Sequence, residues 1–262
     1  MSSIFNFNRF AKVLDYDIKR SVQNYGLAMI ILIMMPYIHT LLVGMFSLVI
    51  DGVWRSPSAT SRWIMFGMAC FLFVLSYGVS SYGYLTDKKA GSDYVLLPAS
   101  VTEKFLSMVL NCALIAPIVF AAAYLLNDWV VVKTGLAAGN GIVTGSSFIN
   151  GDNDVYVNIW EIGFISLSIN TLFFLLGAIF FAKRKVSMTL LVLLGLLILI
   201  IPVVIAIAKS GLSIDGDVVP PFCSRYSDNI DLLVNSFIYI SIIVEYILLL
   251  VLIFFRIKTI KH

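Results

Sequence analysis

Two ionisable residues lie within apolar stretches of the chain and are the first candidates for chemistry. Glu245 follows a run of isoleucines and a valine, and His39 lies in an earlier apolar stretch. An ionisable side chain inside a membrane helix is costly and indicates a functional site by default. One hypothesis is a proton or cation relay, or a contact between Glu245 and a cationic substrate. The alternative, which we favour, is a carboxyl group that hydrogen-bonds another helix at a subunit interface and a histidine that packs between helices.

The sequence contains none of the common enzyme motifs. It has no GxxxxGK[ST] phosphate loop, no HExxH, no GxSxG and no paired Cys/His set. Cys70 and Cys112 lie in apolar runs, where cysteine behaves as a small hydrophobic residue, and Cys223 stands alone in a polar segment. We therefore expect no enzyme, no metal and no cofactor in this chain. Energy for any uphill transport has to come from an ion gradient or a separate subunit.

The composition is that of a protein in a lipid bilayer. The chain has 262 residues, of which 60% are hydrophobic and only 13% are charged, whereas soluble domains carry about 25% charged residues. The formal net charge of +3 is too small to indicate a nucleic-acid partner. We expect an all-α membrane protein.

Six apolar stretches come close to the roughly 20 residues that a helix needs to cross a bilayer. They are residues 27–50, 63–85, 105–132, 159–182, 187–208 and 235–257. They predict a transmembrane domain over residues 27–258, followed by a short tail at 259–262.

The first 26 residues predict an amphipathic helix that lies in the headgroup plane. The apolar side chains of Phe7, Phe10, Leu14 and Ile18 recur at steps of three and four residues, with basic residues on the other side. A basic amphipathic helix in front of a first span typically binds the membrane interface.

The basic residues also predict the orientation. With the N-terminus in the cytoplasm, 13 of the 18 Lys and Arg residues fall on the cytoplasmic side and 5 on the other. Because basic residues concentrate on the cytoplasmic side of membrane proteins, we expect both termini to be cytoplasmic. The segment 86–104, between the second and third spans, is then cytoplasmic too.

This cytoplasmic segment carries a sharp local signal. Ser100 and Glu103 fit a capping box, in which each side chain bonds the other residue's backbone amide. Pro98 disfavours a helical Leu97 and cannot continue a helix itself. A helix is therefore predicted to begin at Ser100, and a capped, charged segment of this kind is predicted to dock a partner.

The same segment resembles a known family. The residues LPAS at 97–100, followed by EKFL at 103–106, resemble the LPxS..EK segment of ABC-2-type permeases, particularly bacterial ones. The basic N-terminal helix and six spans resemble the membrane subunit of type-2 ABC transporters. The resemblance implies that residues 1–26 form a connecting or elbow helix, and that 86–104 contains a coupling helix that docks onto a separate ATP-hydrolysing subunit. It also implies a second permease copy or a sister permease, with ATP and Mg²⁺ on the partner subunit.

The resemblance further implies residue roles. Tyr94, Val95 and Leu96 would offer an apolar knob to the ATPase, and the charged residues would set the register. The implied coupling residues are Asp87, Lys88, Lys89, Asp93, Tyr94, Val95, Leu96, Pro98, Ser100, Glu103 and Lys104.

Three functions stay open from the sequence. The leading hypothesis is the permease subunit of an ABC exporter, a multi-pass protein of the bacterial inner membrane. The second is an ion-coupled secondary transporter that uses Glu245 and His39 and needs no ATPase. The third is a membrane scaffold or sensor that transports nothing.

Overall fold

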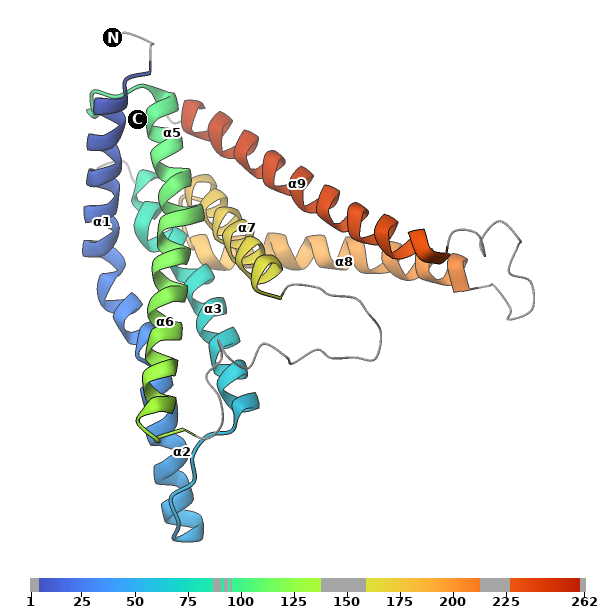
Figure 1. The fold of residues 1–262 in the computed structure, drawn as a ribbon. Helices are drawn as coiled ribbons and strands as arrows, with labels where there is room; N and C mark the ends of the chain where they lie inside the picture. The colour runs from blue at the N-terminus through green and yellow to red at the C-terminus, as the bar shows by residue number, and fades with distance from the viewer. Residues whose placement is uncertain are drawn as a thin grey trace.

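The computed structural model describes residues 5–86, 91, 94, 96–137, 159–212 and 227–259, and its regular secondary structure is helical throughout these ranges (Figure 1). The first half of the chain forms α1 (Phe7–Ile33), α2 (Met35–Asp51), α3 (Ala59–Tyr82) and the short 3₁₀ turn η1 (Gly83–Thr86). The second half forms α5 (Val101–Leu110), the π-helical turn η2 (Asn111–Ile115), α6 (Ala116–Lys133), α7 (Ile159–Phe180), α8 (Lys185–Leu212) and α9 (Ser227–Thr259).

The first helix is longer than the sequence predicted. Helix α1 continues past Gly26 to Ile33 and then bends by 40° into α2. Gly26 lowers helix propensity but does not end a helix, whereas Pro36, in the first turn of α2, has no amide donor and sits next to the bend. The expected elbow helix and the beginning of the expected first span therefore belong to one helix, and the domain boundary at residue 26 stays a prediction.

The described residues contain four helices that are long and apolar enough to cross a membrane, or five if the bent α1–α2 pair is one span. The four are Ala59–Thr86, Val101–Lys133, Gly163–Phe180 and Tyr239–Thr259. They coincide with the second, third, fourth and sixth predicted spans. In α8, the stretch Lys185–Leu199 is apolar but shorter than the others. The six-span topology therefore stays a prediction.

The core lies where α1, α3, α6 and α7 meet. Helices α1 and α5–α6 run side by side, α3 packs against α1 and α7, and α9 slants away from them (Figure 1). The rings of Phe73 and Phe120 stack with centroids 4.5 Å apart, and Tyr25 meets Tyr77 edge-on at 5.3 Å. Aromatic pairs of this geometry bury large areas and fix the relative rotation of the helices.

Helices α3 and α7 approach each other closely at Gly78. A Cβ atom at this position would lie 2.9 Å from the backbone nitrogen of Leu175. Small residues permit such close helix packing inside membranes. The small residues of α3 therefore serve packing within the chain at this point.

Candidate functional site

Several helix ends gather at one end of the molecule, which we call the basic end. It contains the first residues of α1 and α5 and the last residues of α7 and α9 (Figure 1). The rings of Phe105 and Phe254 lie edge-on at 5.4 Å, and Arg256 Nε donates to the carbonyl of Ile179 at 3.0 Å. The sequence predicts this end to be cytoplasmic from its basic residues.

Glu103 joins two helix starts at the basic end. The predicted capping box is confirmed: the Ser100 amide donates to Glu103 Oε2 at 2.8 Å, and the Glu103 amide donates to Ser100 Oγ at 3.2 Å. Its other oxygen, Oε1, accepts from the Asn6 amide at 2.8 Å and from Arg9 Nη2 at 3.0 Å. The side chain of Glu103 is 0% exposed. One buried carboxylate thus fixes the beginning of α5 to the beginning of α1.

At the beginning of α5 lies an exposed apolar surface, which we call the tip and define as Leu96, Pro98 and Val101. Leu96 is 77% exposed, and the other two side chains are exposed as well. Residues 91, 94 and 96 are helical. The tip therefore stands on the capped start of α5, which Glu103 fixes to α1.

Besides Glu103, two further implied coupling residues are buried, Tyr94 and Lys104. Tyr94 is 3% exposed, and its hydroxyl donates to Asp17 Oδ2 at 3.5 Å and to the Lys104 carbonyl at 3.4 Å. Lys104 is buried, with its ammonium nitrogen 5.6 Å from the centre of the Tyr94 ring. The expectation that Tyr94 contributes to a surface knob is therefore wrong, because its ring fills the space between α1 and α5. Asp87, Lys88, Lys89, Asp93 and Val95 lie outside the described residues.

The predicted apolar face of the first helix is only partly buried. Phe10 is buried, Leu14 and Ile18 are half-buried, and Phe7 is exposed. The face of α1 that packs against α3 and α5 is instead built from Phe10, Val13, Asp17, Ser21 and Tyr25. The first helix is therefore integrated into the bundle along a face that includes polar residues.

These polar residues form a buried group that we call the Asp17 cluster: Asp17, Ser21, Tyr77, Tyr82, Tyr94, Ser107 and Asn111. Ser107 Oγ donates to Asp17 Oδ2 at 2.5 Å. Asn111 Nδ2 donates to Ser21 Oγ and to the Tyr82 hydroxyl, each at 2.9 Å, and Asn111 Oδ1 accepts from Tyr77 at 3.2 Å. Asn111 begins the π-helical turn η2, and such turns occur frequently at functional sites. Sequence reasoning missed the cluster, because Asp17 and Ser21 are polar and do not belong to an apolar stripe of α1.

The opposite end of the molecule, which we call the far end, is closed by a buried ion pair. Arg62 Nη1 at the beginning of α3 lies 3.0 and 3.2 Å from the two carboxylate oxygens of Asp128 in α6. The two side chains are 3% and 2% exposed. His39 in α2 is half-buried and close enough to Arg62 for their charges to interact.

Glu245 and His39 lie on different helices. Glu245 is exposed on α9, His39 is half-buried on α2, and these two helices point to different parts of the molecule (Figure 1). A direct proton transfer needs the two groups within hydrogen-bond reach or joined by a water molecule. No hydrogen bond among the described residues joins Glu245 to His39, and the relay stays a hypothesis.

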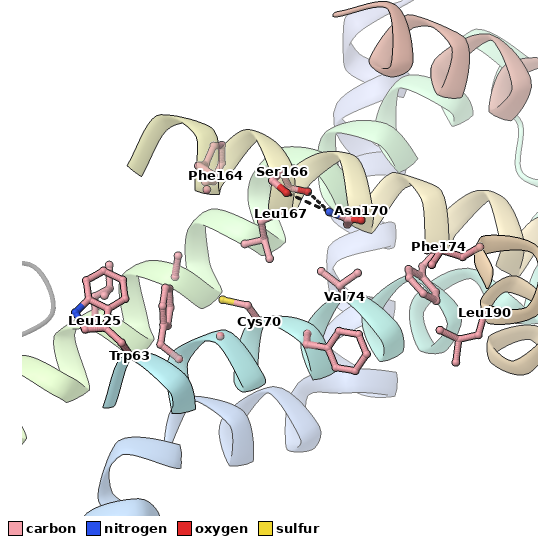
Figure 2. A pocket seen from close by; sticks show the side chains of 16 residues that line it. Trp63, Cys70, Val74, Leu125, Phe164, Ser166, Leu167, Asn170, Phe174 and Leu190 are labelled. Carbon is pink, nitrogen blue, oxygen red and sulfur yellow. Dashed lines mark hydrogen bonds between the residues drawn. The ribbon is translucent and has the colours of Figure 1, made fainter. Parts of the chain in front are cut away.

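An apolar cavity of about 450 Å³ lies between α3, α6, α7 and α8. Figure 2 shows Trp63, Cys70 and Phe174 around it, with Asn170 and Ser166 as a polar pair on α7. Asn170 Nδ2 donates to the Ser166 carbonyl at 2.8 Å, so the side-chain amide of Asn170 hydrogen-bonds within its own helix. The cavity suits an apolar ligand such as a hydrocarbon chain.

The described residues thus offer three features that could carry a function: the tip, the Asp17 cluster and the apolar cavity. The tip could contact another protein, and the cavity could hold an apolar molecule. In the Asp17 cluster, the carboxyl group of Asp17 could gain or lose a proton. No family model matches the chain, and neither does any curated protein or any solved structure.

Proposed function

We propose that this chain is the permease subunit of an ABC-2-type exporter and that its ATPase subunit docks on the tip. The observation that carries the proposal is the set of hydrogen bonds to Glu103, which tie the beginning of α5, next to the exposed apolar tip, to the beginning of α1. A docking site that transmits force needs an exposed contact surface and a firm attachment to the membrane helices. An exposed apolar patch also marks a protein contact more often than an unused surface.

The hydrogen bonds to Glu103 would transmit a displacement of the tip to α1 and to α5–α6 at the same time. Helices α5 and α6 and the turn η2 form one run of 33 residues, Val101–Lys133. Glu103 at its beginning also holds Asn6 and Arg9, which precede and begin α1. A push on the tip would therefore move α1 and α5–α6 together as a rigid body. ATP and Mg²⁺ belong to the partner, and this chain supplies the contact and the path.

The apolar lining of the cavity favours an apolar substrate for the proposed exporter. Its walls come from α3, α6, α7 and α8, so relative movement of these helices changes its shape. In the proposed assembly a second permease copy, identical or related, completes the path through the bacterial inner membrane, with both termini in the cytoplasm.

Photo-crosslinking from the tip tests the proposal. A photoreactive amino acid replaces Leu96 in native membranes, and the captured protein is tested for ATP binding. Val53, an exposed apolar residue between α2 and α3, is the matched control. We expect position 96 to capture a nucleotide-binding protein that position 53 does not capture. Capture of no such protein from position 96, or equal capture from both positions, would contradict the proposal.

A further inference from the structure

We propose that Asp17 is a proton-binding site and that its protonation is linked to the position of the segment that carries the tip. The proposal goes beyond the coupling function, because it concerns the charge of one buried carboxyl group and holds whatever partner binds the tip. It rests on the hydrogen bonds around Asp17, on the oxygen that these bonds leave unused, and on the path from Tyr94 to the tip.

The surroundings of Asp17 stabilise its charge incompletely. The residue is 2% exposed, and Oδ2 accepts from Ser107 at 2.5 Å and from Tyr94 at 3.5 Å. Its second oxygen, Oδ1, is buried and has no hydrogen-bond partner among the described residues. An unmatched oxygen on a buried carboxylate is costly, and proton uptake removes that cost by neutralising the group.

No direct ion pair fixes Asp17 in the charged form. The ion pairs of the described residues do not include it. The charged and titratable groups that face it are Arg20 on its own helix, Tyr82 on α3, Tyr94, Lys104 on α5 and Cys112 on η2. Burial favours the neutral form of the carboxyl group, whereas the hydroxyl donors and the distant cations favour the charged form. These opposing effects allow the group to change its charge.

Tyr94 links this charge to the tip. Burial raises the pKa of its phenol well above the usual range, so the hydroxyl keeps its single proton and shares it between Asp17 Oδ2 at 3.5 Å and the Lys104 carbonyl at 3.4 Å. Tyr94 lies two residues before Leu96. When Asp17 takes up a proton, its oxygen becomes a weaker acceptor, and the hold of α1 on this segment weakens.

Infrared spectroscopy of the purified chain tests proton binding directly. Difference spectra between about pH 5 and pH 9 report the C=O stretch of protonated carboxyl groups. We expect a band that is lost in Asp17→Asn and kept in Asp15→Asn, a matched change of an exposed carboxylate on the same helix. A spectrum that is unchanged in Asp17→Asn would overturn the proposal.

Ser107→Ala keeps the test decisive if Asp17→Asn does not fold. The variant removes the closest donor to the charged form, so the carboxyl group should take up its proton at a higher pH, by about one unit. A purely structural role of Asp17 predicts no such shift. An unchanged titration midpoint in Ser107→Ala would also overturn the proposal.

A spin label on Leu96→Cys tests the link to the tip, with the unsubstituted chain labelled in parallel to subtract the native cysteines. We expect the label to gain mobility as the pH falls through the titration of Asp17, and this change to disappear in Asp17→Asn. The same mobility change in Asp17→Asn would show that the segment responds to another group.

Discussion

The two ends of the helix bundle are held together in different ways. At the basic end the contacts are distributed: Glu103 accepts bonds from two elements, Thr86 Oγ1 donates to the Phe181 carbonyl at 3.4 Å, and Lys185 Nζ donates to the Gly83 carbonyl. At the far end one buried charge pair, Arg62 with Asp128, closes α3 onto α6.

The difference has a physical consequence. Distributed hydrogen bonds to backbone groups contribute about 1 kcal/mol each and can be lost one at a time. A buried ion pair either holds both charges or leaves one charge uncompensated. The basic end should therefore weaken gradually as single contacts are removed, whereas loss of either charge at the far end should have a large effect.

The largest expected effect comes from breaking the far-end pair. Asp128→Ala removes the carboxylate 3.0 Å from the buried Arg62 guanidinium and should lower the free energy of unfolding by about 3–5 kcal/mol. Denaturant unfolding in detergent measures this. Asp51→Ala removes one partner of an exposed pair with Arg55 and should cost about 1 kcal/mol or less. Equal costs for the two variants would remove the distinction between the ends.

Removing both far-end charges sharpens the same point. Arg62→Leu together with Asp128→Leu should recover most of the stability that Asp128→Ala loses, because no buried charge is left. The measurement is a double-mutant cycle with both single leucine variants. If the losses in unfolding free energy of the two single variants added up to the loss of the double variant, the two charges would not interact.

At the basic end we expect a moderate effect from Glu103→Ala. The variant removes the acceptor for the amides of Ser100 and Asn6 and for Arg9, at a cost of about 2 kcal/mol. Hydrogen exchange at the beginning of α1 should rise as well, since Asn6 and Arg9 are released. If hydrogen exchange rose only in α5, Glu103 would be a cap of α5 and would not connect α5 to α1.

The smallest expected effects come from two matched helix caps. Ser100 caps α5 at the basic end, and Ser58 caps α3 near the far end. Each change to alanine should cost about 1 kcal/mol. Ser100→Ala should cost somewhat more, because Glu103 loses part of its support. Thermal unfolding of the two variants side by side checks this, and a larger loss for Ser58→Ala would contradict it.

Local signals in the sequence predicted local structure well. Ser100 and Glu103 specify a capping box through their own side chains, and the apolar runs predicted four of the spans by length and composition alone. Helix α1 continues past Gly26 to Ile33, because glycine only weakens a helix and α1 packs against α3 and α5. The domain boundary expected at residue 26 stays a prediction.

The buried polar residues could not be predicted in the same way. Tyr94 and Lys104 look like surface residues next to a charged loop, yet both are buried. Asp17 belongs to a helix with a basic face, and only the position of Ser107, ninety residues away, makes its burial evident. Such contacts depend on which helices pack together, and the pattern of one helix does not specify that.

The most direct test of the central claim is a pull-down of the tagged chain from its native host in mild detergent. We predict that a soluble ATP-hydrolysing subunit co-purifies with the chain, that Leu96→Asp abolishes the association, and that Val53→Asp leaves it intact. Recovery of the chain without such a subunit, while transport continues in the host, would contradict the account and favour a carrier driven by an ion gradient.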